Sequence, residues 1–215
     1  MTKNPAHTIP DLIMANIPRD LLMGIEDALE AGAMRAFSKT KDLAKGHRKS
    51  ALGQMRHFQM NETFNEALLA ANAEMVPLRG NGVVVGKSGV LQLSRLNISE
   101  SAWNNSNRSV TRRKLAEANK GMKHLLLPSL FDPVEVNAGT LFIVACFSGS
   151  LQIHPEKPTQ IYIAVPDEKM EGWLFREKLG LFLSRYDEAP KQVDLAQPKL
   201  KTKLLNTERQ TASWN

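Results

Sequence analysis

Residues Val83 to Leu93 read VVVGKSGVLQL, and the character of the sequence changes at this point. Two apolar runs, residues 83–85 and 90–93, flank a short segment that begins and ends with glycine. Apolar β-branched runs around such a segment are typical of a β-hairpin. The sequence before the stretch has helical periodicity and the sequence after it is rich in β-type runs. This change of character predicts an α+β protein, because regular βαβ alternation is missing.

The residues before Pro77 are expected to be helical. Asp20, which follows Pro18, is a suitable N-cap for a first helix. The apolar residues that recur at helical spacing in this helix are Leu21, Leu22, Ile25, Ala28, Leu29 and Phe37. Two further helices are expected over residues 41–60, weakened by Gly46 and Gly53, and over residues 62–75 after Asn61. Residues 1–76 are therefore predicted to form a helical N-terminal region.

The remainder of the chain predicts a sheet with flanking helices. Three β-rich runs follow the hairpin, and they cover residues 140–147, 151–154 and 160–165. A short helix is expected over residues 111–119, and an amphipathic helix from Pro166 to Leu183. The pattern predicts a mixed, mainly antiparallel β-sheet core over residues 77–188 and a basic, weakly ordered tail over residues 189–215. Alternatively, residues 1–188 form one continuous domain.

Composition excludes several classes of protein. The chain has 215 residues, of which 42% are hydrophobic and 23% charged, as in ordinary globular proteins. Its single cysteine, Cys146, excludes a disulfide scaffold and lies in an apolar run, where a small buried hydrophobe is expected. No apolar run approaches the ~18 residues of a membrane span, and the N-terminus lacks a signal-peptide pattern. We therefore expect a cytoplasmic protein with no membrane partner.

Positive charge is concentrated in two internal segments. The formal net charge is +6 at pH 7, yet residues 35–57 contain seven Lys or Arg against one Asp. Residues 95–124 contain seven Lys or Arg against two Glu. Segregated charge of this kind attracts polyanions. The alternative is that these cations cover solvated helix faces or pair with acidic segments of the fold.

The most suggestive segment is NNSNRSVTRRK, residues 104–114, a polar loop that leads into a helix. Cations in the first turn of a helix oppose its macrodipole, and the free N–H groups at a helix start attract phosphate. Asn and Ser side chains there can donate hydrogen bonds to phosphate oxygens. Because a hairpin precedes this helix, the helix lacks the partner that a helix-turn-helix motif requires.

We therefore predict binding of nucleic acid or another polyanion, and the sequence favours neither DNA nor RNA. The residues expected to bind it are Arg108, Arg112, Arg113 and Lys114, with a second patch of Lys45, Arg48, Lys49 and Arg56. Trp103, directly before the loop, could stack on an exposed base or could anchor the loop in the core. No cofactor is required for this function.

An enzymatic alternative comes from Asp167-Glu168-Lys169, which follows the apolar run Ile161–Val165. This triplet resembles the second half of the PD-(D/E)xK nuclease signature. The resemblance implies Mg²⁺ held by two acids and a lysine that helps to position the attacking water, with Asp167 and Lys169 in these roles. The first acid would be Asp132, Glu135 or Glu156, although Pro166 stands where the pattern expects strand. A plain helix start capped by Asp167 is the other interpretation.

One other motif suggests a phosphate site but does not fit the required pattern. Gly86-Lys87-Ser88 lacks the spacing of a phosphate loop and is followed by a strand instead of a helix, so it is expected to be a hairpin turn. A third function class remains open, an interaction module or homo-oligomer in which basic segments meet the acidic segments of a neighbouring copy.

Overall fold

The computed structural model describes residues 8–75, 82–126 and 136–187, and it confirms the α+β class. A six-stranded sheet has its strands in chain order. These are β1 (Glu74–Met75), β2 (Val85–Ser88), β3 (Leu91–Ser99), β4 (Gly139–Phe147), β5 (Gln160–Pro166) and β6 (Trp173–Lys178). Only β3 and β4 are parallel, and all other neighbours are antiparallel, so the sheet is mixed and mainly antiparallel as predicted.

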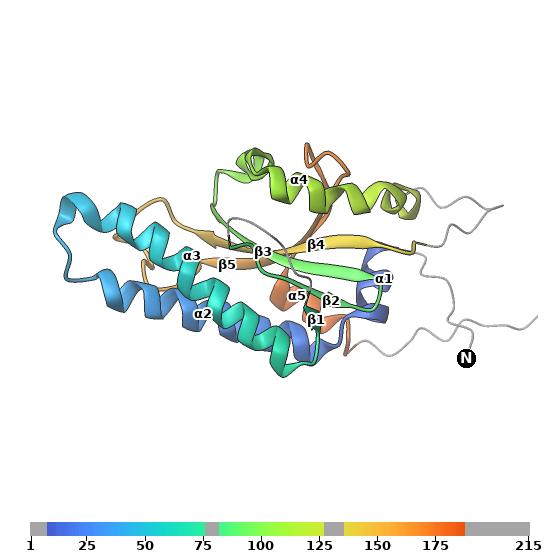
Figure 1. The fold of residues 1–215 in the computed structure, drawn as a ribbon, viewed down its shortest axis with the longest axis horizontal. Coiled ribbons are helices and arrows are strands. Elements are labelled where there is room, and N and C mark those ends of the chain that lie inside the picture. The colour runs from blue at the N-terminus through green and yellow to red at the C-terminus, as the bar shows by residue number, and fades with distance from the viewer. Residues whose placement is uncertain (1–7, 76–81, 127–135, 188–215) are drawn as a thin grey trace, which may run out of the picture.

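Helices cover both faces of the sheet (Figure 1). Four of them pack against the first face: α1 (Ile9–Asn16), α2 (Arg19–Thr40), α3 (Lys45–Ala70) and α5 (Leu179–Ser184). The second face carries α4 (Val110–Ala116), which lies between two 3-10 helices, η1 (Trp103–Arg108) and η2 (Glu117–Leu125). These three belong to the connection from β3 to β4, because parallel neighbours need a crossover.

The central strand β4 is buried along its whole length and divides the core in two. Leu141 and Ile143 face the α1–α2–α3–α5 side, whereas Phe142 and Val144 face the α4 side. This alternation follows from the two-residue period of a strand. Cys146 is free and buried on the α4 side, as the sequence predicted, and burial raises the pKa of its thiol to about 12.

The predicted hairpin is present and is fixed to the N-terminal helix. Gly89 occupies its turn with φ +57°, a left-handed conformation that favours glycine. Ser88 Oγ donates to the carbonyl of Asn16 at 2.6 Å, and the N–H of Val90 donates to Asn16 Oδ1 at 3.1 Å. The segment Gly86-Lys87-Ser88 was predicted to be the turn, and that was wrong: it lies in β2, and the turn is at residues 89–90 because Ser88 already pairs with Leu91.

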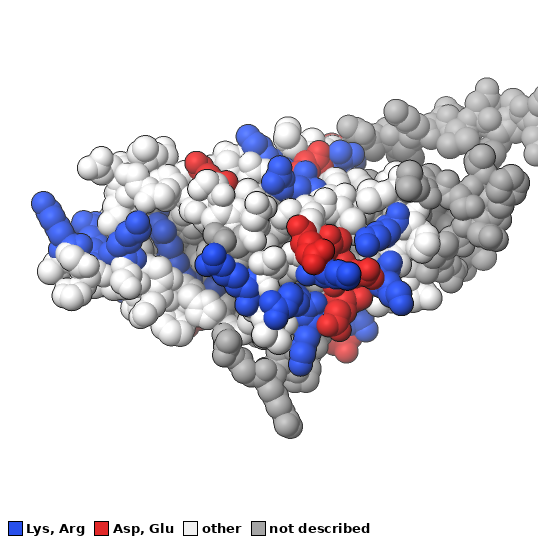
Figure 2. Space-filling model, turned by 90° about the horizontal axis from the view of Figure 1, so that it is seen from above, with Lys and Arg blue, Asp and Glu red and all other residues white. Residues whose placement is uncertain are grey.

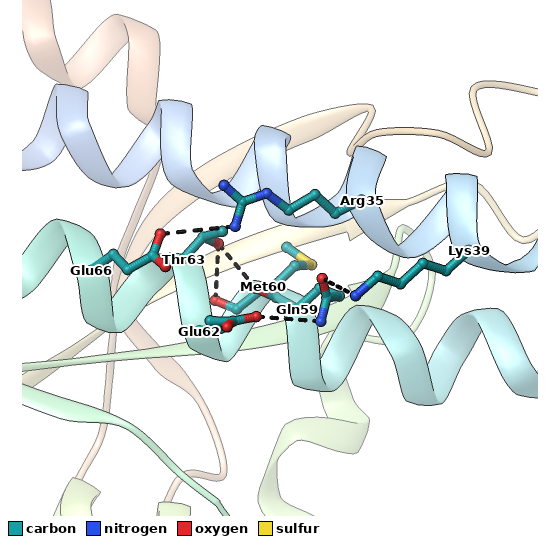
Figure 3. Close-up of polar contacts among 7 residues, drawn as sticks. All are labelled: Arg35, Lys39, Gln59, Met60, Glu62, Thr63 and Glu66. Carbon is teal, nitrogen blue, oxygen red and sulfur yellow. Dashed lines mark hydrogen bonds and ion pairs between the residues drawn. The ribbon is translucent and has the colours of Figure 1, made fainter.

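The helices α2 and α3 form a closely packed hairpin (Figure 3). At Gly32 the two backbones approach so closely that a Cβ atom would lie 2.8 Å from Met60 Cα. Polar pairs flank this contact, with Lys39 Nζ donating to Gln59 Oε1 at 3.0 Å and Arg35 lying 3.9 Å from Glu66. The expected first helix is found as α2, but its N-cap is Pro18, and Asp20 lies in its first turn without capping it.

Three further local predictions were wrong. The helices expected over residues 41–60 and 62–75 are one continuous helix, α3, because Asn61 uses its side chain for a tertiary contact with the carbonyl of Gly82 and not as a cap. Residues 151–154 form turns and bends, not a strand. The helix expected from Pro166 to Leu183 is a tight turn at Asp167, then β6, and only then α5. The helix α1 was not predicted.

Candidate anion-binding pocket

The candidate site lies where β3 extends beyond its partner β2. The two strands pair only from Leu91 to Ser94, the last pair being Val85 with Ser94. From Arg95 to Ser99 this edge of β3 has no strand partner among the described residues. Before β2 the chain turns toward α3, where Asn61 holds it through the carbonyl of Gly82. A notch is left at the edge of the sheet.

The notch forms a hollow of ≈ 220 Å³ between α3, β3 and α4. Residues at successive i, i+4 positions of α3 form one wall, the exposed edge of β3 forms the floor, and α4 closes the other side. The lining residues are Gly53, His57, Asn61, Val83, Arg95, Leu96, Asn97 and Arg112. Gly53 contributes to the open space, because a Cβ atom built on it would meet no other atom within 4 Å.

Arg95 forms the floor of this pocket. Its side chain follows Leu91 and Leu93 on the α3 face of the sheet and is only 6% exposed. One terminal nitrogen donates to Asn97 Oδ1 at 2.9 Å and the other to the carbonyl of His57 at 2.6 Å. These contacts hold the guanidinium in place, since a planar fork with both arms bonded has little freedom.

The charge of Arg95 is not neutralised by any described residue. No carboxylate among them lies within 4.0 Å of its guanidinium, and its buried Nε has no hydrogen-bond partner there. Burial, reinforced by the positive charge of Arg112, lowers the pKa of Arg95 to about 9. Arg95 is therefore still protonated at neutral pH, and a buried cation without a counter-charge is costly.

Arg112 supplies a second cation from the opposite side of the sheet. The crossover that carries it is anchored by Asn119, which is buried and donates to the carbonyls of Thr140 and Pro166 at 2.9 and 2.8 Å. Within the described chain, the guanidinium of Arg112 has no hydrogen bond or ion pair, and burial lowers its pKa. Two guanidinium groups thus line one hollow, an arrangement suited to a bound anion.

The other cations predicted on the loop–helix segment lie outside the pocket. Arg113 is exposed and donates to the carbonyl of Asn107 at 2.7 Å. Arg108 and Lys114 are also exposed. Ser109 caps α4 by accepting the N–H of Arg112 at 3.4 Å. An anion would therefore be bound by side chains of this short helix and not by the N–H groups at its start. Among the side chains of this segment that the structure describes, only Arg112 lines the pocket.

The second predicted patch lies along the first half of α3. Lys45 and Lys49 are exposed near the start of the helix. Arg48 lies 5.4 Å from the centre of the Phe37 ring. Arg56 lies 3.8 Å from the centre of the Phe147 ring and donates to the carbonyl of Pro155, and burial lowers its pKa to about 10. Arg48 and Arg56 are thus engaged in packing, whereas the two lysines are free to meet solvent.

Figure 2 shows how these cations are spread over the α4 side of the molecule. Lys and Arg gather at the end that carries the α2–α3 connection, at the left of the view, and again across the middle of the face. Asp and Glu side chains lie among the second group. This face is therefore of mixed charge, and the pocket differs from it by holding two cations with no carboxylate of a described residue within 4.0 Å.

Trp103 lies within an aromatic cluster. Its ring meets the rings of Tyr162 and Trp173 edge to face, at 5.2 Å between centroids in both cases. The guanidinium of Arg176 lies 4.5 Å from the centre of the Trp103 ring. These contacts favour the interpretation of Trp103 as a core anchor over that of a stacking platform for bases.

The residues of the predicted nuclease site are only partly described. Asp167 Oδ1 accepts the N–H groups of Lys169 and Glu171, both at 3.0 Å, in the turn between β5 and β6. Lys169 is exposed, and Asp132 and Glu135 lie outside the described residues. Among residues 8–75, 82–126 and 136–187, no three His, Cys, Asp or Glu side chains are grouped to hold a metal ion. The magnesium site stays a prediction.

Comparisons with protein-family models, with curated proteins and with solved structures found no match for this chain. The helices of the described part of the chain include none long and apolar enough to cross a membrane. The pocket therefore has to be interpreted from its own chemistry. Sequence reasoning missed Arg95, and the available signal was an arginine at the position where the alternation of Leu91 and Leu93 would place the next apolar residue.

Proposed function

We propose that the protein binds nucleic acid or another polyanion and that the Arg95–Arg112 pocket is its phosphate-binding subsite. The observation that carries the proposal is the convergence of two guanidinium groups on one hollow with no carboxylate within 4.0 Å among the described residues. A bound phosphate would supply the counter-charge and accept hydrogen bonds from both forks.

The surface around the pocket supports an extended anion over a small isolated one. Arg108, Arg113 and Lys114 lie on the same loop–helix segment as Arg112 and are exposed. Arginine and lysine side chains of this kind position nucleic acids through their phosphates without reading the sequence. The proposal is therefore for a binder with weak sequence preference.

The test is equilibrium binding of fluorescent single-stranded DNA, duplex DNA and single-stranded RNA over a range of salt concentrations. We expect log affinity to fall linearly with log salt, because each phosphate contact releases counterions. Arg112→Ala should weaken binding and reduce the magnitude of the slope by about one. Absence of binding to all three ligands at low salt, or a slope unchanged in a variant carrying both Arg112→Ala and Arg113→Ala, would contradict the proposal.

The same preparation separates the alternatives. Binding is measured with EDTA present, and plasmid is then incubated with the protein and Mg²⁺. Cleavage that Asp167→Ala abolishes would favour the nuclease, whereas cleavage that persists in the variant would exclude that site. Sedimentation at low and high salt without nucleic acid tests the oligomer, because self-association through opposite charges weakens as salt screens them.

A further inference from the structure

Resting on the proposed function, we infer that the Arg95–Arg112 pocket recognises a terminal phosphate, a phosphate monoester at a strand end, in preference to the phosphodiesters within a strand. The binding surface as a whole holds the polyanion, and the pocket identifies its end.

The charge of the pocket fits a monoester. Two cations face the hollow, and no carboxylate of the described chain lies within 4.0 Å of either guanidinium. A phosphate monoester carries about 1.5 to 2 negative charges at neutral pH, because its second ionisation has a pKa of about 6. A phosphodiester within a strand carries a single charge. Only the monoester neutralises both arginines.

The shape of the pocket points the same way. Its ≈ 220 Å³ is many times the roughly 10–15 Å³ needed to hold one water molecule, so there is space for a phosphate group and part of a sugar. The hollow is bounded by α3, by the chain at Val83 and by α4, with β3 as its floor. A phosphate within a nucleic-acid strand is joined to sugars on both sides, so both flanking nucleotides would have to fit into the notch. A terminal phosphate is joined to one sugar only, so only one nucleotide has to fit beside it.

The donors at the floor are preorganised for such a group. Arg95 is held by Asn97 and by the carbonyl of His57, so its guanidinium is fixed before a ligand binds. Arg112 lines the hollow from α4, and its guanidinium makes no hydrogen bond or ion pair with any described residue. Donors that are already placed cost little reorganisation when a ligand binds.

The experiment compares two oligonucleotides of one sequence, labelled at the 3′ end and carrying either a 5′-phosphate or a 5′-hydroxyl. We expect the wild-type protein to bind the phosphorylated strand about tenfold tighter, the effect of a charge-assisted hydrogen bond at the low end of its range. A second pair with the phosphate at the 3′ end asks which end is read. Inorganic phosphate and a nucleoside 5′-monophosphate are added as competitors to separate free phosphate esters from strand ends.

Two neighbouring arginines give a matched control. Arg112→Ala should remove the preference, so that the two strands bind with equal affinity. Arg113→Ala makes the same chemical change one residue away, outside the pocket, and should weaken both strands alike while the preference persists. If Arg112→Ala fails to fold, Arg112→Lys retains the charge but loses the fork, and is expected to retain only part of the preference.

The outcomes distinguish the inference from the proposal beneath it. Equal binding of phosphorylated and hydroxyl strands at either end by the wild-type protein overturns end recognition and leaves polyanion binding intact. A preference that survives Arg112→Ala overturns the assignment to this pocket. Binding of neither strand overturns both.

Discussion

The two sides of α3 are packed in opposite ways. On one side, α2 approaches until Gly32 touches the backbone at Met60, and polar pairs cross the contact. On the other side, Gly53, His57 and Asn61 line a hollow that also contains two arginines without described acidic partners. The closed side buries apolar surface and stabilises the fold. The open side leaves buried charge uncompensated, a cost that a ligand would relieve, and so we assign stability to one side and binding to the other.

The largest expected effect is at the closed side. Gly32→Ala places a methyl group 2.8 Å from Met60 Cα and 2.5 Å from Thr63 Oγ1, so the helices must move apart. We expect the free energy of unfolding to fall by about 3 kcal/mol, the upper end of the usual cost of overpacking, because one of the two close contacts is with backbone. Urea unfolding followed by circular dichroism measures it.

Gly24→Ala is the control for this substitution. Gly24 lies in the same helix, but nothing stands within 4 Å of its Cβ position, so the variant should be more stable than the wild type by about 0.5–1 kcal/mol. If the two glycine substitutions have the same sign, then close packing is not what distinguishes the two sides of α3.

The second prediction tests the open side through its ligand. At a phosphate concentration a hundredfold above its dissociation constant, binding to the folded state alone stabilises by about 2.7 kcal/mol. We expect phosphate to raise the thermal midpoint relative to chloride of equal ionic strength. The increment should disappear in Arg112→Ala and persist in Arg113→Ala. An equal increment in both variants would show a general salt effect on the protein and no role for the pocket.

The third prediction concerns the thiol of Cys146, which is buried in the core and, unlike Arg95, does not line the pocket. Cys146 has its pKa raised from 9.0 to about 12, chiefly by burial and then by the charge of Glu100. Below pH 9 the thiol is neutral in both folded and unfolded chains, and its ionisation has no effect on stability. Above that pH the unfolded chain ionises first, so stability is lost progressively as the pH rises toward 12.

The size of this effect is about 1.4 kcal/mol for one pH unit above the unfolded pKa. It is measured as the difference in unfolding free energy between wild type and Cys146→Ala, because titration of other groups cancels in that difference. We expect the unfolding free energy of the wild type to fall relative to that of Cys146→Ala as the pH increases. A constant difference would show that solvent reaches Cys146 in the folded protein, contrary to its 1% exposure.

Much of the fold could be predicted from local pattern. The α2 helix follows from the spacing of its apolar residues, and the β2–β3 hairpin from two apolar runs around glycines. Failures occurred where tertiary contacts override local signals. Asn61 looks like a helix start because such residues favour caps, but its side chain is used to hold Gly82. The segment after Asp167 has helical spacing, yet residues 173–178 pair with β5 as the edge strand of the sheet.

The candidate site could be predicted only in part. Arg112 was found because cations cluster around it in the sequence. Arg95 was not, because a single charge in an apolar strand gives no local sign of whether it faces a partner, solvent or a hollow. That depends on where β2 stops pairing, and on Arg112 arriving from the other face of the sheet. The end of β2–β3 pairing and the position of Arg112 both depend on tertiary structure at the sheet edge. Neither can be predicted from the sequence around Arg95 or around Arg112 alone.

The smallest expected effect is at the open side of α3. Gly53→Ala adds a methyl group to the pocket wall where no other atom lies within 4 Å, and it replaces a poor helix former in the middle of a long helix. We expect a gain of about 0.5–1 kcal/mol in urea unfolding, from the helix propensity alone. Because the pocket has room for the methyl group, the thermal increment given by phosphate should stay close to that of the wild type. A loss of stability would mean that this side of α3 is as closed as the side that meets Gly32, and the contrast between them would fail.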